Sequence, residues 1–311
     1  MFVPEKSLGG TELLLAGLLS SIKHDVSKFN IIRTICDPGL IDKNKINILW
    51  VHVHTDQASV ARIVDPEFIN HIAAIVFVSH WQFLNFRNAF SLPLEKCHVI
   101  LNAIHEFPKR EKRRNEVVKL IYTSTPWRGL DVLLDSFELL GRDDVELSVY
   151  SSAAIYGKEF YDNHDHDYEY LYERARSMKG VKYHGFISNE EIRRKLVETD
   201  IFAYPSNWAE TFCLSMVEAA AAGCRIVVTD WGALPEIAGS FAVYVPMQYD
   251  KTSLAVEYSK VLNQALDEIW SEDTQNLLDH QTVYFNKFFS WNYRRSQWEE
   301  LFSNLLKSTN S

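Results

Sequence analysis

Long apolar runs are missing from this chain of 311 residues. No stretch approaches the roughly 20 apolar residues that a membrane-spanning helix needs. The first ten residues, MFVPEKSLGG, also lack the basic start and apolar middle of a secretory signal. We therefore expect a cytoplasmic protein that at most rests on a membrane surface.

Cysteine is scarce, and no glycine-rich dinucleotide motif follows an apolar run. The cysteine spacing is typical neither of a metal site nor of a disulfide framework, so we interpret these residues as reduced core residues. The absence of Gly-x-Gly-x-x-Gly after a strand argues against a dinucleotide-dependent oxidoreductase. The four cysteines are Cys36, Cys97, Cys213 and Cys224.

Positive charge is in deficit as well. The formal net charge of -9 gives no general attraction to nucleic acid, so we expect no nucleic-acid partner. One local basic run, KREKRR at 109–114, is interpreted as a solvated linker between domains. The alternative is a contact with anionic lipid head groups or with a charged acceptor.

Short apolar runs rich in β-branched residues alternate along the chain with amphipathic stretches. The runs predict buried strands, and the amphipathic stretches predict helices. The expected strands span 30–36, 46–53, 72–79, 97–103, 117–124, 145–151, 181–186, 200–206, 225–230 and 241–246. The expected helices span 11–23, 57–63, 80–90, 130–140, 168–178, 189–198, 212–222, 252–270, 273–288 and the segment after 290.

Strands that are nearly continuous in apolar residues and separated by helices predict parallel sheets covered on both faces. We therefore predict an α/β protein with two doubly wound, Rossmann-like domains. The N-terminal domain is assigned to 1–106 and the C-terminal domain to 107–290, and a C-terminal helix at 291–311 is free to return to the N-terminal domain. Ligands bind such sheets at the carboxyl ends of the strands.

Two glutamates flank the start of the helix that Gly223 ends. Glu210 lies in the loop before this helix and Glu218 about two turns inside it, where it can accept two hydrogen bonds from the vicinal diol of a ribose. On spacing alone, Glu210 as a solvated loop residue and Glu218 paired with an arginine remain open. The N-terminal amides of the helix favour a phosphate. They belong to Phe212, Cys213 and Leu214.

The whole run DIFAYPSNWAETFCLSMVEAAAAGCRIVVTDWGALPEI at 200–237 resembles the signature of retaining glycosyltransferases of family 4, which have the GT-B fold. Four other segments carry the same resemblance: LGGTELLLAGLL with Gly10, VILNAIHEF before the second domain, RGLDVLLDSFELL with Arg128, and VKYHGFIS with Gly185 and Phe186. The resemblance implies transfer of a sugar from a nucleotide diphosphate sugar, UDP- or GDP-linked, to a hydroxyl of a glycan, a lipid-linked or another acceptor. It also implies retention of anomeric configuration, no metal and no cofactor.

The resemblance assigns roles to individual residues. Arg128 and Glu210 are expected to be catalytic, with Arg128 at the donor diphosphate and Glu210 at the sugar. Glu218 is expected to bind the ribose. Further donor contacts are expected from Gly10, Thr123, Ser124, Arg128, Gly185, Phe186, Phe212, Cys213 and Leu214.

The chain departs from the family pattern at several positions. Arg128 replaces the usual lysine, which keeps the charge and adds a fork suited to phosphate. Thr123 stands where a second basic residue is usual. Thr211 and Cys213 replace glycines, and Thr211 is a candidate N-cap of the helix. The opening strand is reduced to MFVP, so the N-terminal domain is predicted to be short.

Alternating residues in ILWVHVHTD place Trp50, His52 and His54 on one face if the strand persists. The resemblance favours His52 as a catalytic histidine that faces the donor sugar, with His54 second. A core histidine or a loop histidine is the alternative. His54, and Ser79 and His80 at the end of the next strand, are candidates for the acceptor side.

The segment DNHDHDYEY at 162–170 imitates the metal-binding Asp-x-Asp of another glycosyltransferase fold. It does not follow a buried strand directly and is strongly polar, so we interpret it as a solvated loop and predict no metal site. Three alternatives to a transferase stay open. They are a nucleotide-binding protein of the same fold without transfer activity, an oxidoreductase, and a nucleotide-sugar epimerase.

Overall fold

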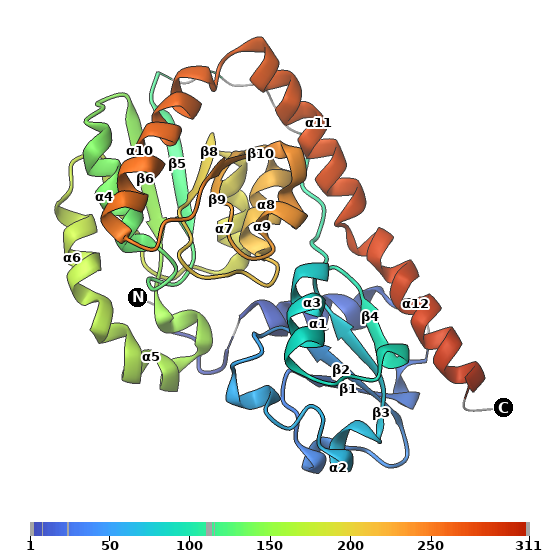
Figure 1. Ribbon diagram of the computed structural model, residues 1–311. Helices are drawn as coiled ribbons and strands as arrows, with labels where there is room; N and C mark the ends of the chain where they lie inside the picture. Colours follow the sequence, from blue (N-terminus) through green and yellow to red (C-terminus); the bar gives the residue numbers. More distant parts are fainter. Residues whose placement is uncertain (1–2, 8, 24, 110–113, 115, 309–311) are drawn as a thin grey trace. The chain divides into compact units, whose positions relative to one another are not determined.

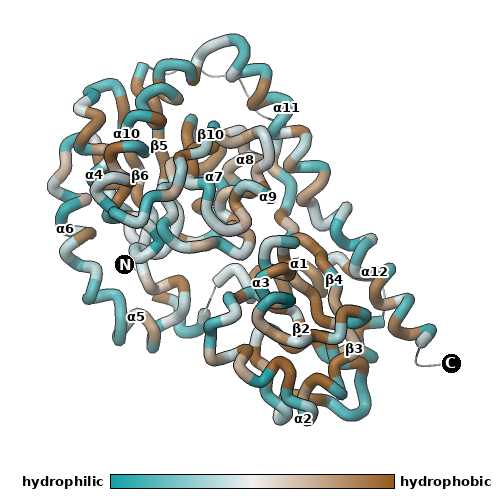
Figure 2. Tube along the Cα trace, viewed as in Figure 1, coloured by the Kyte–Doolittle hydropathy of each residue, from teal (hydrophilic) through white to brown (hydrophobic). Residues whose placement is uncertain are grey.

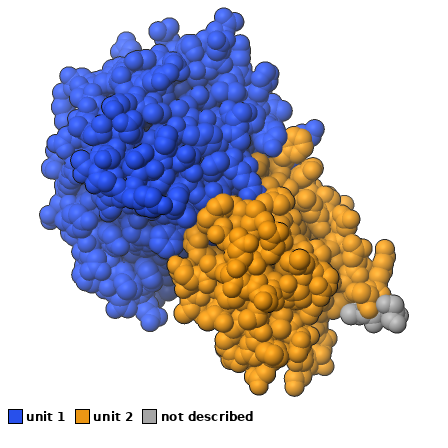
Figure 3. Space-filling view, in the orientation of Figure 1, with its two compact units in different colours: residues 1–12, 106–287 blue, residues 13–105, 288–311 orange. Residues whose placement is uncertain are grey.

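The computed structural model describes residues 3–7, 9–23, 25–109, 114 and 116–308, which form two compact units (Figures 1 and 3). Unit 1 consists of Met1–Glu12 and Glu106–Lys287, and unit 2 of Leu13–His105 and Phe288–Ser311. The first twelve residues therefore group with the C-terminal sheet, although we assigned them to the N-terminal domain.

Unit 1 is built on a six-stranded parallel sheet with the order β10-β9-β8-β5-β6-β7. The chain leaves β7 at one edge and returns to β8 in the middle, as in a doubly wound fold. Its strands are β5 (Val118–Thr123), β6 (Val145–Tyr150), β7 (Val181–Tyr183), β8 (Ile201–Tyr204), β9 (Arg225–Thr229) and β10 (Ala242–Val245). Its helices are α4 (Leu130–Leu140), α5 (Lys158–His164), α6 (Glu169–Ser177), α7 (Asn189–Val197), α8 (Leu214–Ala222), α9 (Leu234–Ala238), α10 (Lys251–Glu268) and α11 (Glu272–Phe288).

Unit 2 is built on a four-stranded parallel sheet with the order β1-β2-β3-β4. The strands are β1 (Phe29–Arg33), β2 (Ile46–Val51), β3 (Ile72–Phe77) and β4 (Cys97–Val99), and the helices are α1 (Gly10–Ser21), α2 (Pro66–Ile69), α3 (His80–Ala89) and α12 (Trp291–Ser308). Figure 2 shows hydrophobic residues concentrated along the strands of both sheets, as burial on both faces requires.

The C-terminal helix α12 supplies one side of the core of unit 2. The ring of Trp298 lies 4.8 Å from that of Trp50 on β2, and Phe302 stacks at 4.3 Å on Phe29 of β1. Helix α1 packs closely against the start of α12 at Gly17. A Cβ atom at this glycine would lie only 2.5 Å from the Trp291 ring, so a larger residue would not fit. The first and last helices of the chain are therefore packed together in one unit.

Most predicted elements are present, and the differences concern short segments. The helix expected at 57–63 is reduced to the 3-10 helix η3 (Ala58–Val60), and the strand expected at 46–53 ends at Val51. Helices α2, α5 and α9 have seven residues or fewer, which is too short for a clear 3.6-residue period.

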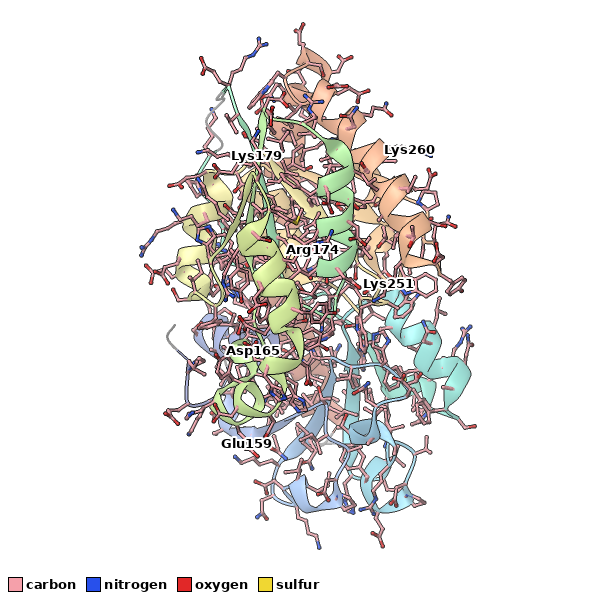
Figure 4. The ribbon with its side chains drawn as sticks, turned by 90° about the vertical axis from the view of Figure 1, so that its left-hand side faces the viewer. Glu159, Asp165, Arg174, Lys179, Lys251 and Lys260 are labelled. Carbon is pink, nitrogen blue, oxygen red and sulfur yellow. The ribbon has the colours of Figure 1, made fainter. Side chains whose placement is uncertain are left out.

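Ion pairs tie the outer helices of unit 1 together. Arg174 of α6 binds Asp135 at 2.5 Å and Glu138 at 2.8 Å, both on α4. Lys251 at the start of α10, which Figure 4 labels together with Arg174, pairs with Asp131, also on α4. Such pairs lie at the surface and contribute little, so the apolar core carries the stability of the unit. Among the described residues, none of the helices combines the length and the apolar character that crossing a membrane requires.

Replacing Trp298 with alanine should lower the free energy of unfolding of unit 2 by about 3–5 kcal/mol, the range for truncating a buried aromatic residue. The physical reason is the cavity left between α12 and β2, because Trp298 is 1% exposed. Chemical denaturation followed by tryptophan fluorescence and circular dichroism measures the change.

Tyr293→Ala is the matched control, because this side chain lies on the same helix and is 41% exposed. Equal stability of the two variants would show that α12 is not part of the core of unit 2.

Candidate functional site

The carboxyl ends of β5, β8 and β9 bring three loops together in unit 1, and two glycines allow their backbones to touch. Gly129 has φ +99°, and a Cβ there would lie 2.2 Å from the carbonyl oxygen of Pro205. Gly232 has φ +68°, and a Cβ there would lie 2.5 Å from the backbone nitrogen and oxygen of Glu210. Any side chain at either position would therefore force the loops apart.

An ion pair between the partly exposed Arg128, whose side chain is 26% exposed, and the buried Glu210 lies where these loops meet. The Nη1 of Arg128 donates to both carboxylate oxygens of Glu210, at 2.8 and 3.0 Å, and the hydroxyl of Tyr204 donates to Oε1 at 2.5 Å. The side chain of Glu210 is only 5% exposed, so its interpretation as a solvated loop residue is wrong. A buried carboxylate needs such partners, because an unpaired charge in the interior is costly.

The electrostatics of the pair keep both donors protonated. Burial is the largest single influence on Arg128 and opposes its charge, but Glu210, together with smaller contributions from Tyr204, Tyr156 and Cys213, raises the pKa of the guanidinium well above its ordinary value. Burial, and after it the charge of Glu210, raise the pKa of the Tyr204 hydroxyl well above its ordinary value. Arg128 therefore carries a permanent positive charge, and Tyr204 remains a hydrogen-bond donor at neutral pH.

Several polar atoms at this edge of the sheet are buried without a hydrogen-bond partner among the described residues. They are Nε of Arg128, Oγ1 of Thr123 and Thr125, and Oγ of Ser151. Nearby, the hydroxyls of Ser124 and Tyr204 lie 3.3 Å apart. Buried polar groups are normally satisfied, so a group of unsatisfied atoms at the carboxyl ends of β5 and β6 favours a polar ligand there.

Helix α8 begins one loop after Glu210, slightly later than we expected. Its first helical residue is Leu214, Cys213 is the N-cap in the left-handed region (φ 73°), and Phe212 precedes the helix. The candidate N-cap Thr211 is therefore wrong, and the helical amides of the predicted anion site start at Leu214. The left-handed backbone at Cys213 explains why glycine suits this position in the resembled pattern.

The N-terminal segment lies beside this helix start. A Cβ at Gly10 would be 3.0 Å from the Leu214 side chain, and a Cβ at Gly157 would be 2.9 Å from the backbone of Lys6. Ser7 donates a hydrogen bond of 3.2 Å to Glu12. These contacts explain why the first twelve residues group with unit 1, and they bring Gly10 and Leu214 together as the resemblance implies.

Glu218 is paired with an arginine, which is one of the two possibilities that its spacing left open. Arg193 donates to Oε1 at 2.9 Å and Asn189 to Oε2 at 3.3 Å. Burial raises the pKa of Glu218 above its ordinary value, and the two partners oppose that rise. The side chain is 12% exposed, so Glu218 is a nearly buried carboxylate held from one side.

The turn HGFIS leads from β7 to the residues that hold Glu218. Gly185 has φ 68° and, together with Phe186, connects β7 to α7, whose first residue is Asn189. Asn189 and Arg193 are four residues apart and therefore lie on one face of α7. This i, i+4 spacing of polar residues on a helix after the turn is the signal that sequence reasoning missed. It likewise missed Tyr204, whose hydroxyl is hidden in an apolar strand.

The histidine candidates lie in unit 2 after the end of β2, so strand alternation does not orient them. His52 packs at 4.7 Å on Trp50, and His54 lies edge-on to Trp81 at 5.7 Å. Burial, with a smaller effect of Arg33, lowers the pKa of His52 to about 3. Its imidazole is therefore neutral at pH 7.

The acceptor-side candidates begin helix α3. Ser79 is buried and caps the helix by accepting a 3.0 Å hydrogen bond from the amide of Gln82. His80 is the first helical residue and is exposed. Ser79 thus has a structural role whether or not an acceptor lies nearby.

The polar segment around Asp165 is not a solvated loop. It forms α5, the 3-10 helix η6 (Asp165–Tyr168) and α6, and Asp165 is 6% exposed (Figure 4). Its carboxylate accepts hydrogen bonds from the Ser152 hydroxyl at 2.9 Å, the Ala153 amide at 2.6 Å and the Tyr172 hydroxyl at 2.9 Å. Asp165 therefore organises the backbone after β6.

The sequence also raised the questions of a metal site and of the basic run at 109–114. Within the described ranges, no group of three or more His, Cys, Asp or Glu residues is arranged to hold a metal ion. Of the basic run at 109–114, residues 110–113 lie outside the described residues.

Comparison with known proteins identifies related chains. Residues 103–276 match the family described as glycosyl transferases group 1. The GPI3 subunit of phosphatidylinositol N-acetylglucosaminyltransferase from Saccharomyces cerevisiae is 27% identical over 207 residues, which are 65% of this chain and 42% of the yeast protein. MMP alpha-(1->4)-mannosyltransferase from Mycolicibacterium hassiacum is 29% identical over 210 residues, which are 65% of this chain and 47% of that protein. The chain thus spans less than half the length of these relatives.

Solved structures share the fold over nearly the whole chain. Anabaena HepE in complex with UDP and glucose has a TM-score of 0.67 at 15% identity and covers 97% of this chain and 85% of its own. A glycosyltransferase from Rickettsia africae has a TM-score of 0.68 at 16% identity and covers 99% of this chain and 85% of its own. With two parallel α/β sheets in the structure, this similarity confirms the predicted GT-B fold. Because the family match includes more than half of the sequence, the chain belongs to the glycosyl transferases group 1 family.

Proposed function

We propose that this chain is a retaining glycosyltransferase that moves a sugar from a UDP- or GDP-linked donor to an acceptor hydroxyl without a metal. The observation that carries the proposal is the cluster of Arg128 with the buried Glu210 and Tyr204 before the start of α8, with Glu218 farther along the same helix. A cation for the diphosphate, the carboxylate of Glu210 for the sugar and the carboxylate of Glu218 for the ribose are then available in one unit for the three parts of a nucleotide sugar.

Arg128 is suited to a departing diphosphate. Its Nη1 is engaged by Glu210, but its Nε has no partner among the described residues and remains available to a phosphate oxygen. In the reaction the bond from the anomeric carbon to the phosphate oxygen breaks, and negative charge grows on the diphosphate. The guanidinium and the first amides of α8 stabilise this charge electrostatically, which is the role that a metal has in other enzymes.

Retention requires that the new bond forms on the face from which the diphosphate leaves. The acceptor oxygen bonds to the anomeric carbon, and its proton passes to the departing phosphate oxygen, so no protein base is needed. Glu210 orients the sugar through its hydroxyls. We assign His52 to a contact with the donor sugar, as a neutral hydrogen-bonding group rather than an acid, because its pKa is far below 7.

Related proteins support a nucleotide-sugar donor and leave the acceptor class broad. HepE was crystallised with UDP-glucose, and pneumococcal GtfA with UDP and GlcNAc. The yeast relative is named for transfer of N-acetylglucosamine to phosphatidylinositol, and the bacterial relative for transfer of mannose. We therefore propose a glycan or lipid-linked acceptor, with contact to a membrane surface in the lipid-linked case.

A donor panel tests the proposal. UDP-, GDP-, ADP- and TDP-sugars are screened by thermal shift, where a donor at 100 times its dissociation constant stabilises the fold by about 2.7 kcal/mol. Donors that bind are then followed for hydrolysis and transfer. Binding without either reaction would identify a nucleotide-sugar-binding protein instead, and a donor with an inverted sugar centre would identify an epimerase.

Replacing each of the two glutamates by glutamine should separate recognition of the ribose from recognition of the sugar. Glu218→Gln should weaken binding of the nucleoside diphosphate and of the complete donor alike by roughly 1.5–3 kcal/mol, because each loses hydrogen bonds to a charged acceptor. Glu210→Gln should weaken mainly the sugar-bearing donor. Calorimetric titration with the diphosphate and a non-hydrolysable donor measures both effects. Unchanged nucleotide affinity in Glu218→Gln would leave this carboxylate a structural role only.

Arg128→Ala is expected to cost stability as well as turnover. It leaves Glu210 buried without its cation, a loss of about 3–5 kcal/mol for breaking a buried pair. The double variant Arg128→Gln/Glu210→Gln removes both charges and should recover much of that stability while staying inactive. Thermal melts and transfer assays of the single and double variants form the cycle. Near-normal turnover of the double variant would show that Arg128 has no role in the transfer reaction.

His52→Ala should reduce turnover while leaving nucleotide affinity nearly intact, because the proposed contact is to the sugar and not to the nucleotide. His54→Ala is the matched control in the same loop. Steady-state kinetics and nucleotide titration of both variants measure the effect. The opposite pattern, with only His54→Ala impaired, would show that the wrong histidine was assigned.

A further inference from the structure

Arg193 contacts Glu218 and the segment at Glu106 and Phe107, and the proposed transfer reaction gives it no role. Its Nη1 donates to Glu218 at 2.9 Å, and its Nη2 donates to the backbone carbonyl of Glu106 at 3.0 Å. The guanidinium also lies 3.8 Å over the ring of Phe107. One side chain on α7 therefore connects the carboxylate on α8 to the segment where the chain enters unit 1.

The entering segment is itself anchored to α8. The amide of Phe107 donates to Oδ1 of Asn286 at 2.6 Å, and Nδ2 of Asn286 donates to the carbonyl of Ala221 at 2.9 Å. Ala221 lies on the same helix as Glu218, so the contacts form a closed ring through α7, the entering segment, α11 and α8. Such a ring fixes the position of the Arg193 guanidinium from two sides.

Arg193 is held in place more firmly than a surface arginine. Its side chain is 19% exposed, Phe107 is 8% exposed, and a cation over an aromatic face is stabilised most where water is excluded. By contrast, the neighbouring Arg194 pairs with Glu190 on an open surface, with the two side chains 67% and 79% exposed.

We propose that Arg193 is a positioning residue for the ribose of a nucleoside diphosphate, because it pairs with the carboxylate of Glu218 and holds it in one orientation through its own anchor on Glu106 and Phe107. The inference rests on the proposed function, since it assigns Glu218 to the ribose. Each carboxylate oxygen of Glu218 has one protein donor, Arg193 or Asn189, and an ionised carboxylate has about four acceptor sites, which leaves sites for the two hydroxyls of a diol.

The arrangement makes a prediction about pH. Burial raises the pKa of Glu218, and Arg193 is the charged group that opposes the rise, helped by the hydrogen bond from Asn189. Without Arg193 the pKa must rise further, so Glu218 becomes protonated at a higher pH and loses its strength as an acceptor. The loss of nucleotide affinity on acidification should therefore begin at a higher pH when Arg193 is replaced.

The test is calorimetric titration of the full chain with UDP, GDP and inorganic diphosphate between pH 5.5 and 8. Arg193→Gln should weaken the nucleotide that the wild type binds by roughly tenfold at pH 7, as expected for a lost charge-assisted contact, and by a larger factor at lower pH. The affinity for inorganic diphosphate, which lacks a ribose, should stay unchanged. The terminal phosphate of the nucleotide titrates in both proteins, and the ratio of the two affinities removes this common effect.

Three variants keep the test decisive. Arg194→Gln is the matched control and should bind like the wild type. Phe107→Leu keeps every charge but removes the aromatic anchor, and should weaken the nucleotide a few-fold without affecting diphosphate. Arg193→Lys keeps the charge and should preserve the pH profile while binding more weakly, because lysine lacks the fork that joins Glu218 to Glu106.

The outcomes separate this inference from the proposed function. If the wild type binds no nucleotide, the proposed function fails. If Glu218→Gln weakens the nucleotide but Arg193→Gln matches the wild type at every pH, only the positioning role fails. Equal weakening of nucleotide and inorganic diphosphate in Arg193→Gln would place Arg193 at the phosphates and also overturn the inference.

Discussion

The ion pair between Arg128 and the buried carboxylate of Glu210 is the constraint on which the site depends. A carboxylate with 5% exposure is stable only with its cation and the Tyr204 hydroxyl in place, so the carboxyl ends of β5 and β8, which supply these two groups, must converge. Gly129 and Gly232 make this convergence possible, because only a glycine fits against the backbone of Pro205 or of Glu210. The motif that is read as a catalytic signature is therefore also a folding requirement of unit 1.

Arg128 and Glu218, both in unit 1, have different electrostatic environments. Arg128 keeps a permanent charge beside a region of unsatisfied polar atoms, whereas Glu218 is balanced between burial and Arg193. The first arrangement suits a charge that grows during a reaction, and the second suits a neutral diol that must be held still. Because the two glutamates are eight residues apart, Glu210 lies in the loop before α8 and Glu218 lies within α8.

The sequence predicts much of the fold and part of the candidate site. Apolar strands, and the loops that follow them at the carboxyl end of a parallel sheet, are local patterns that can be recognised in the sequence. Most strand and helix positions in unit 1 follow from such patterns, and the family resemblance selects Arg128 and Glu210 as residues of one candidate site. Partnerships between distant segments are not local: the burial of Glu210 by Tyr204, the ring through Arg193, and the packing of α12 on β2 depend on how elements assemble. Asp165 was misinterpreted for the same reason, since polar neighbours conceal a carboxylate that Ser152 and Tyr172 bury.

The stereochemistry of transfer tests the central claim most directly. Wild-type protein is incubated with the donor that it binds, a suitable acceptor and excess chelator, and the anomeric signal of the first product is followed by proton NMR. The account predicts turnover in the presence of the chelator and a product with the same anomeric configuration as the donor. An inverted first product, or transfer that stops on chelation and returns with a divalent metal, would contradict it.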